Sequence, residues 1–468
     1  MADKRRIAAT GRIVTGVVGI VVFVGVAVAV GQNDLPVLAA DAPTLTVTPT
    51  ASDQSRLCPG PLLRQGVDAT AGSFATPALT VSANSATEQA PLVTPDNTSG
   101  DQFGLPTTVS AASADGEDSP LIAAAQSQYV ASDDLTGFAA TACGEVSADS
   151  WLVGGSTDVG RTTLLSLSNP TRTDAVVDLS FFGETGEIDA PGAKGIVVPA
   201  GENRLHSLAS FAPGVRTPVI RVQSAGGQVF SALQHSVTRG ITPGGIELSA
   251  PTTPPSTDQV IPGVVLAASA PVASGDVYDD SVGALRLFVP GTEAANVALS
   301  FVSEQGAEAP VPVDHSILPG VVNEITLPDL PAGSYTVSIA SDLPLVAAAR
   351  TTAVVGESSD FAWFGSSAPL DERSQLAVAP GDGARVHLFN PTSSPLEVVL
   401  TDGSGVETRV AVPAGGAVAP RVAGGMAYGV TGAGGAHAQV SFEGPRGFSA
   451  YAVQPPKPLA TPVTVYPR

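Results

Sequence analysis

Short runs of alternating apolar and polar residues recur along this chain, and they predict β-strands. The clearest series gives five candidate strands, at 164–167, 176–182, 195–198, 219–222 and 229–233. In several of these runs apolar and polar residues alternate, which predicts one buried and one solvent-exposed face, as in packed antiparallel sheets. Gly183-Glu184-Thr185-Gly186 has the composition of a hairpin turn. Helical periodicity is essentially absent after residue 31, so the pattern predicts an all-β fold.

Two patterns repeat along the chain. The first occurs at Ile122–Gln126, Phe230–Gln234, Val346–Arg350 and Phe448–Ala452, with starts 108, 116 and 102 residues apart. The second places a leucine nine residues after a strand-ending proline, in the pairs Pro170 with Leu179, Pro290 with Leu299, and Pro391 with Leu400. A period of about 100 residues exceeds the ~20 to 50 of solenoid repeats and fits whole β-sandwich domains.

The N-terminus predicts a membrane segment. Residues 1–12 contain four basic residues and one acidic residue, and residues 13–31 carry no charge. Nineteen residues at ~1.5 Å each span roughly 28 Å, about one bilayer core. Basic residues before the segment favour a cytoplasmic N-terminus and an exported remainder, hence a single-pass protein of the cell membrane. Cleavage near Ala39, after Val37-Leu38, would instead give a secreted protein.

The predicted fold class is therefore all-β, with tandem immunoglobulin-like antiparallel β-sandwich modules after one N-terminal transmembrane helix. The predicted segments, in chain order, are a cytoplasmic basic tail (1–12), the transmembrane anchor (13–31), an extracellular spacer (32–56), a degenerate β module (57–144) and three β-sandwich modules (145–250, 258–356 and 361–468).

Cys58 and Cys143 are the only cysteines, and they bracket the module with the weakest repeat pattern. An exported protein lies in an oxidising compartment, so we predict a disulfide between them. Closing a loop of this length stabilises a fold by roughly 4 to 5 kcal/mol in the chain-entropy model.

Trp151 and Trp363 are the only tryptophans, and the pattern predicts that both begin a strand just after a module's closing strand. This shared position favours packing in a core or between modules. The alternative is a surface platform on which a sugar ring stacks.

Three short motifs carry a resemblance to a known family: WLVGGST at 151–157, LSNP at 167–170 and GETG at 183–186. With these motifs in this order, the chain resembles an uncharacterised family of actinobacterial exported proteins known only as a domain of unknown function. The resemblance covers nearly the whole exported region. It implies an anchored envelope protein and supplies no catalytic residues.

The charge and the motifs argue against several functions. Beyond residue 12 the chain holds 18 basic and 42 acidic residues, a net charge of −24, which makes nucleic acid a poor partner. No metal-ligand spacing joins any of the five histidines, which are His206, His235, His315, His387 and His437. No serine stands in a nucleophile motif. We therefore predict no enzyme, no cofactor and no metal site. The carboxylate pairs Asp133-Asp134 and Asp279-Asp280 are better interpreted as solvated loops than as calcium ligands.

The sequence thus predicts a non-catalytic cell-envelope protein, a membrane-anchored array of β-sandwich modules that acts as an extracellular stalk or an interaction scaffold. Its partner would be an unknown envelope protein or wall glycan, with residues 13–31 in the membrane. The alternative hypothesis is a cell-wall carbohydrate-binding protein. Few aromatic residues, 5% of the chain, are available to build a stacking face.

Overall fold

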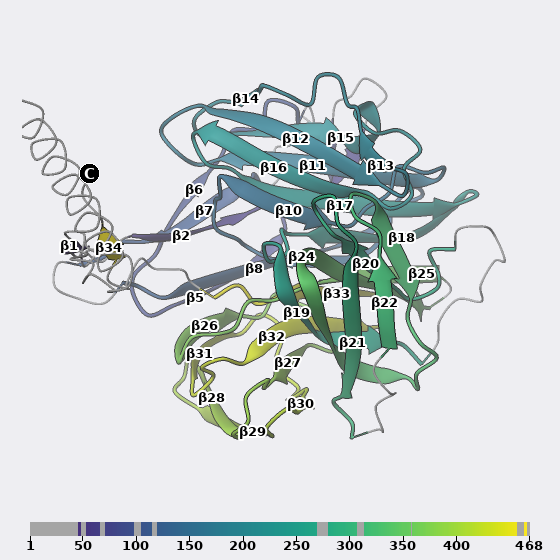
Figure 1. Cartoon of the computed structure of the whole chain (residues 1–468). Helices are drawn as coiled ribbons and strands as arrows, with labels where there is room; N and C mark the ends of the chain where they lie inside the picture. Colours follow the sequence, from purple (N-terminus) through teal and green to yellow (C-terminus); the bar gives the residue numbers. More distant parts are fainter. Residues whose placement is uncertain are drawn as a thin grey trace, which may run out of the picture. The chain divides into compact units, whose positions relative to one another are not determined.

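The computed structural model describes residues 45–47, 53–65, 71–97, 104–114, 119–268, 279–306, 313–356, 358–455 and 463–465. Apart from one 3₁₀ turn, η1 (Leu208–Ser210), the regular elements of these residues are β-strands (Figure 1). Their ladders run antiparallel, so the all-β prediction is confirmed. The predicted tail, the anchor at 13–31 and the site near Ala39 lie outside the described residues. Within the described part of the chain, no helix has the length and apolar character needed to cross a bilayer.

The chain divides into two units. The first comprises Met1–Thr50 with Ala460–Arg468, and its described part is the antiparallel pair of β1 (Leu45–Val47) and β34 (Val463–Val465). The second comprises Ala51–Leu459 and contains the remaining strands.

The first part of the second unit holds two three-stranded sheets and a small hairpin. One sheet has the order β2 (Gln54–Cys58), β7 (Thr107–Ala111), β6 (Glu88–Pro91), and the other the order β5 (Ala78–Ala83), β8 (Ile122–Ala131), β9 (Thr136–Ala142). The hairpin pairs β3 (Leu63–Gln65) with β4 (Ala71–Ser73). Apolar residues of both sheets pack around Cys58 and Cys143.

The next pair of sheets follows the strands that the sequence pattern predicts most clearly. One sheet has the order β10 (Asp149–Val153), β16 (Val219–Gly226), β12 (Ala175–Gly183), β13 (Gly186–Ile188), with β14 (Ile196–Val198) also on β12. The other has the order β15 (Glu202–Ser207), β11 (Arg161–Asn169), β17 (Phe230–Arg239), β18 (Thr242–Ser249). Burial alternates along β12, because its apolar residues face the core between these sheets.

In the third pair, one long strand belongs to both sheets. The first half of β24 (Gly333–Val355) lies between β19 (Ser256–Leu266) and β21 (Ala295–Ser303), with β22 (Val313–Ile317) at the edge. Its second half lies between β20 (Ala284–Phe288) and β25 (Ser358–Gly365), with β23 (Val322–Thr326) beyond β20.

The fourth pair repeats the arrangement. One sheet has the order β26 (Arg373–Ala377), β31 (Ala427–Thr431), β28 (Leu396–Asp402), β29 (Glu407–Val412). The other has the order β30 (Ala417–Val418), β27 (Arg385–Phe389), β32 (His437–Gly444), β33 (Gly447–Ala452). The described strands of the second unit thus form four pairs of sheets in chain order.

The leucine repeat corresponds to this arrangement. Leu179, Leu299 and Leu400 lie on β12, β21 and β28, the matching strands of three sheet pairs, and all three are buried. Asn169 and Asn390, which precede the repeated prolines, each accept a hydrogen bond from a threonine N–H two residues on and donate to nearby carbonyls. These bonds fix the turn that leaves β11 and the turn that leaves β27.

Three details of the predicted register differ from the structure. The copy at Phe448–Ala452 lies on β33, whereas the other copies lie on β8, β17 and β24, whose counterpart here is β32. Neighbouring strands at a buried centre share small and apolar residues, so composition alone does not separate them. The division predicted near 356–361 falls inside the hairpin of β24 and β25. Trp151 on β10 and Trp363 on β25 occupy different, not equivalent, strands.

The four sheet pairs meet through their closing strands. β9 packs against β18 and β33, and β25 packs against the same two strands, so the four strands close a ring. Hydrophobic clusters extend across these junctions; one joins Ala139 of β9 to Ile246 and Leu248 of β18.

Candidate functional site

A buried carboxylate lies where the four closing strands meet. Asp360 on β25 is 2% exposed and accepts four backbone hydrogen bonds. Its Oδ2 accepts from Phe138 on β9 at 3.0 Å and from Phe448 on β33 at 3.1 Å, and its Oδ1 accepts from Ile246 on β18 at 3.1 Å and from its neighbour Phe361 at 3.0 Å. One side chain therefore binds all four strands of the ring.

Three glycines leave the space that this carboxylate fills. Gly137, Gly245 and Gly447 precede Phe138, Ile246 and Phe448, as Asp360 precedes Phe361. A Cβ atom at these glycines would lie 2.9, 2.5 and 2.8 Å from an Asp360 carboxylate oxygen. Three strands thus contribute glycine and the fourth contributes the acid.

A second buried acid lies close to this centre. Glu247 on β18 is fully buried, and its Oε1 accepts a hydrogen bond from Ser449 of β33 at 2.8 Å. The Ser449 Oγ in turn accepts from the Ala140 N–H of β9 at 2.9 Å. Burial raises the pKa of Glu247 well above its usual value, and the nearby Asp360 charge adds to the effect. Burial also raises the pKa of Asp360, to about 7, against the opposing effect of its four N–H donors.

Buried polar side chains also join neighbouring sheet pairs farther out. Arg286 on β20 forms an ion pair with Glu324 at 2.9 Å. It also donates to the carbonyl of Gly155, which follows β10, and to the carbonyl of Pro218, which precedes β16, both in the preceding sheet pair. His387 occupies the corresponding position on β27 and hydrogen-bonds Glu304 at 2.7 Å through Nδ1.

His387 also contacts Ser441 at 2.7 Å through Nε2, which gives the contact order of a Ser–His–acid triad. The side chains of His387 and Glu304 are 0% exposed, and Ser441 is 1% exposed. A substrate has no approach to a hydroxyl buried in this way, so we interpret these contacts as a joint between sheets.

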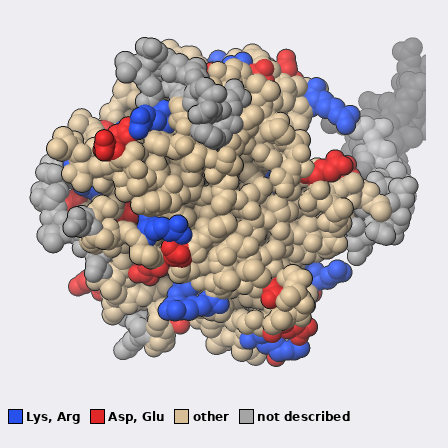
Figure 2. Space-filling view, turned by 180° about the vertical axis from the view of Figure 1, so that it is seen from behind, with Lys and Arg blue, Asp and Glu red and all other residues tan. Residues whose placement is uncertain are grey.

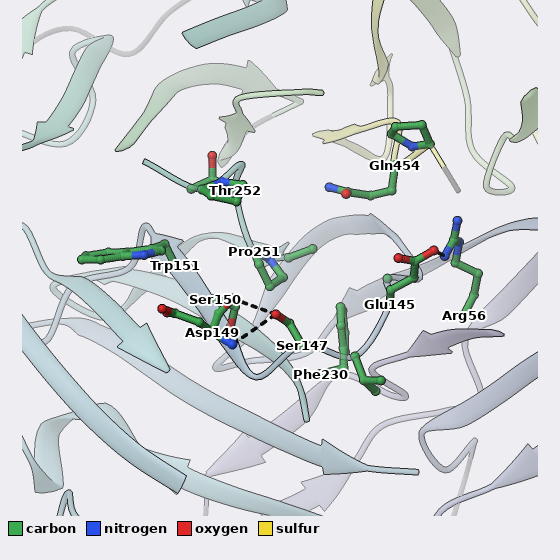
Figure 3. Close-up of a pocket in the computed structure, with 15 residues that line it drawn as sticks. Arg56, Glu145, Ser147, Asp149, Ser150, Trp151, Phe230, Pro251, Thr252 and Gln454 are labelled. Atoms are coloured by element: carbon green, nitrogen blue, oxygen red, sulfur yellow. Dashed lines mark hydrogen bonds and ion pairs between the residues drawn. The ribbon is translucent and has the colours of Figure 1, made fainter. Parts of the chain in front are cut away.

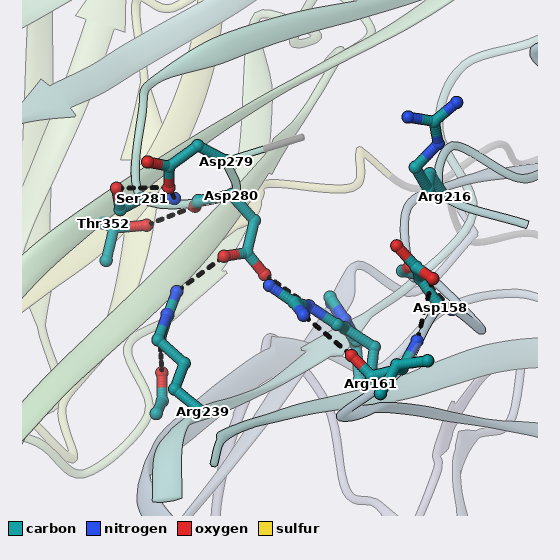
Figure 4. A network of polar contacts seen from close by, with 12 residues as sticks. Asp158, Arg161, Arg216, Arg239, Asp279, Asp280, Ser281 and Thr352 are labelled. Carbon is teal, nitrogen blue, oxygen red and sulfur yellow. Dashed lines mark hydrogen bonds and ion pairs between the residues drawn. The ribbon is translucent and has the colours of Figure 1, made fainter. Parts of the chain in front are cut away.

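Of the two carboxylate pairs considered for calcium, Asp279-Asp280 is engaged by arginine (Figure 4). Asp280 accepts from Arg161 at 2.9 Å and Arg239 at 2.7 Å, while Asp279 accepts from Ser281. Burial alone would raise the pKa of Asp280, but the two guanidinium groups lower it to about 2. Asp134 of the other pair accepts from Arg64 and Ser132. Among the described residues, no group of three or more His, Cys, Asp or Glu could hold a metal ion.

Both tryptophans are buried. Trp151 is 5% exposed and packs against Phe182 and Phe288, and Trp363 is 3% exposed. Arg286 lies over the Trp363 ring at 4.6 Å, and the indole N–H donates to His235 at 3.3 Å. Neither ring offers a free face for stacking a sugar.

Cys58 and Cys143 form the predicted disulfide, across 85 residues. Both are buried, at 3% and 1% exposure, between the two sheets of the first pair.

A pocket of about 170 Å³ lies beside β10, at the segments that connect successive sheet pairs. Figure 3 shows Trp151 at one end of its lining and the ion pair of Arg56 and Glu145 at the other, with Gln454 nearby. The side chains of Phe230 and several prolines form the apolar walls of this pocket. Arg56 is 1% exposed, and its Nε and Nη2 atoms have no hydrogen-bond partner among the described residues. Both atoms are fully buried, so they are closed off from the cavity.

Charged side chains on the surface form small mixed groups. Figure 2 shows basic and acidic atoms side by side on one face, separated by wide uncharged areas. Arg409 with Glu397 and Arg446 with Asp382 are examples of exposed pairs. Such pairs contribute little stability.

The sequence analysis did not identify Asp360, Glu247 or Arg56. Asp360 occupies the same position on β25 that Gly137, Gly245 and Gly447 occupy on the other closing strands. Recognising this from the sequence would require a correct alignment of the four strands. Arg56 could not be found in this way, because its burial and its ion pair with Glu145 depend on contacts that only the folded chain defines.

Comparison with known proteins gives a family and no activity. No curated protein matches the chain. A crystal structure of Thermotoga maritima 1070 is 17% identical over 24% of this chain and 93% of its own, with a TM-score of 0.20. The structure of the chicken CNTN1 FN1-FN3 domains is 9% identical over 69% of this chain and 100% of its own, with a TM-score of 0.08. A family model, described as a family of unknown function (DUF5719), matches residues 98–423. The chain therefore belongs to the family of unknown function DUF5719.

Proposed function

We propose that this chain is a non-catalytic interaction scaffold of the cell envelope. In this proposal residues 13–31 anchor it in the membrane, and immunoglobulin-like β-sandwich modules stand outside. The observation that carries the proposal is the Asp360 centre, where one side chain bonds strands from four sheets. Such a centre suits a rigid body that holds several surfaces in fixed positions, and it favours a scaffold over an extended stalk.

The chemistry of the buried groups supports the same proposal. Asp360, Arg286 and His387 are each engaged by backbone or side-chain partners and have no exposed reactive atom. Each of these three side chains is satisfied by its own hydrogen-bond partners inside a low-dielectric interior. None of these contacts requires a bound substrate.

The test is a pull-down from cell envelope with the tagged full-length chain, with parallel binding to isolated wall polysaccharide. We expect a specific protein partner that an Asp360→Ala variant captures less well, because the surfaces would no longer be held together. Protease treatment of intact cells should remove the region after residue 31. Capture of no protein, or protection of that region from protease, would overturn the proposal.

The alternative function is binding of wall carbohydrate. The buried tryptophans do not favour it, but the pocket beside Trp151 does, because its lining combines apolar walls with polar side chains such as Gln454 and Ser147. Binding to polysaccharide without a protein partner would promote this alternative.

A further inference from the structure

The hairpin that joins β17 to β18 carries an apolar residue at its tip. Ile241 is 95% exposed, the highest value for a large apolar side chain among the described residues, and Val159 in the neighbouring turn is 88% exposed. The two turns are joined by the Thr238 N–H, which donates to the Gly160 carbonyl at 2.7 Å. Turns are built mainly from Gly, Pro, Asn, Asp and Ser, so two adjacent exposed apolar side chains here indicate a contact surface.

The opposite end of β18 lies at the pocket beside β10. Ile241 directly precedes β18, whereas Ala250 and Pro251 directly follow it and line the pocket. The eight residues of β18 span about 26 Å, at ~3.3 Å for each residue. The tip therefore cannot reach the pocket of its own chain, and an Ile241 side chain that enters this pocket must come from a second copy.

The pocket matches the tip in size and in chemistry. Its volume of about 170 Å³ is slightly larger than the ~150 Å³ of a cavity that binds benzene, and the side chain of isoleucine is smaller than that ring. Trp151, Phe230 and Pro251 contribute to the walls of the pocket (Figure 3). Insertion of Ile241 between such walls is favourable because it removes apolar surface from water.

We propose that copies of this chain associate head to tail, with Ile241 of one copy inserted into the pocket beside β10 of the next. Because the tip and the pocket are different surfaces, a pair still has one free tip and one free pocket, and the contact can repeat along a row of chains. A contact made by one hairpin tip is small beside the ~1,200 Å² of a stable interface, so we expect weak association that depends on a high local concentration. The inference rests on the proposed scaffold function, in which the membrane anchor supplies that concentration, and it names a second copy as the partner.

Site-specific cross-linking tests this arrangement on the purified full-length chain at about 1 mM, the range of concentrations that tethering gives. Thr242→Cys places a thiol beside Ile241, and Ala148→Cys places one between two residues that line the pocket; both positions are exposed. The native cysteines are joined in a buried disulfide and do not compete. A mixture of the two single variants, treated with a short bismaleimide, should give a dimer. The double variant should give a ladder of multimers.

The controls separate this contact from random collision. We expect the yield to be at least ten times that of a mixture of Ala148→Cys with Thr408→Cys, a thiol on the exposed part of β29. Adding Ile241→Asp to the Thr242→Cys chain should lower the yield at least tenfold, because the carboxylate would lose water in an apolar pocket. Val406→Asp is the matched control, since Val406 is also an exposed apolar residue in a hairpin turn, at 60%, and it should leave the yield unchanged.

Three results would overturn the proposal: a yield no higher than that of the Thr408 control, a yield that Ile241→Asp leaves unchanged, or cross-linking of Thr242→Cys with itself instead of with Ala148→Cys. The first is the result expected if a wall sugar or another protein occupies the pocket, and the third indicates a symmetric dimer formed tip to tip. Capture of a different envelope protein in the pull-down would leave the scaffold proposal standing while the head-to-tail contact failed, so the two failures are distinguishable.

Discussion

The carboxylate of Asp360 accepts a hydrogen bond at 3.0 Å from the backbone N–H of Phe138, which lies 222 residues earlier in the chain. The same carboxylate bonds Ile246 and Phe448, 114 and 88 residues away. These three contacts can form together only when all four closing strands are in place. The complete set of Asp360 hydrogen bonds therefore indicates that the ring of closing strands has assembled.

Replacing Asp360 should destabilise the whole second unit. An Asp360→Ala variant leaves the N–H groups of Phe138, Ile246 and Phe448 buried without an acceptor, at roughly 4 kcal/mol in total. Urea unfolding followed by circular dichroism measures this. The matched control is Asp133→Ala, at an exposed loop acid, which should change stability by less than ~0.5 kcal/mol. Equal effects of the two variants would contradict the role given to Asp360.

A methyl group at Gly447 should also be destabilising. Its Cβ would lie 2.2 Å from the Phe138 Cβ and 2.8 Å from the Asp360 Oδ2, so backbone must shift. We expect Gly447→Ala to cost about 3 kcal/mol, near the upper end of overpacking effects. Gly403→Ala, where nothing lies within 4 Å of the added atom, is the comparison in a thermal melt. A wild-type melting temperature for Gly447→Ala would show that the centre is less tightly packed.

The stability that Asp360 contributes to the unit should fall between pH 4 and pH 7. Burial raises the pKa of Asp360 from 3.8 to about 7, so the folded state binds more protons than the unfolded chain in this range. The stability linked to Asp360 is fully present below about pH 4 and is lost as the pH rises through about 7. Glu247, whose pKa is also raised, acts with the same sign.

Asp280 acts with the opposite sign, but at lower pH. Its pKa is lowered to about 2, so its contribution is present above 3.8 and is lost as the pH falls toward 2. Burial lowers the pKa values of His206, His235 and His437, so their contribution rises with pH up to about 6.5 and opposes that of the buried acids. The difference in melting temperature between the wild type and Asp360→Asn removes these contributions. This difference should fall as the pH rises from 5 to 8, and a difference that does not change with pH would refute the assignment.

Removing the disulfide should weaken the first sheet pair. The Cys58–Cys143 bond closes a separation of 85 residues, for which chain entropy gives roughly 4 to 5 kcal/mol. The Cys58→Ser, Cys143→Ser double variant should lose much of this in denaturant unfolding. Treatment of the wild type with reductant should reproduce the loss, while reductant should leave the double variant unaffected.

Truncating Trp363 should be costly, because its ring is 3% exposed and contacts both Arg286 and His235. We expect Trp363→Ala to destabilise by ~3 to 5 kcal/mol, as large core truncations do. Tyr129→Ala, at an exposed aromatic residue, is the reference and should change little. Thermal unfolding that is unchanged in Trp363→Ala would contradict the packing role.

The sequence predicted the strand content, the leucine register and the disulfide, because these depend on local alternation and on a single pair of cysteines. It misplaced Phe448–Ala452 by one strand, since β32 and β33 are both buried at the centre and carry similar small residues. It also missed the hairpin of β24 and β25, where Gly356 looks like a boundary but supplies the positive φ of a turn.

The candidate site was less accessible to sequence reasoning. Asp360 follows a serine pair in a segment that resembles a linker, and only the ring of closing strands gives it four donors. The pocket depends on Arg56 and Gln454, 398 residues apart in the sequence, lining one cavity. No local pattern connects residues at that separation.

The central claim is that the four sheet pairs form one cooperative body around Asp360. Native-state hydrogen exchange of the peptides that contain β9, β18, β25 and β33 tests it most directly. The account predicts one shared opening free energy for the four strands, lowered together by Asp360→Ala. Separate opening free energies, or a loss of protection confined to β25 in the variant, would contradict it.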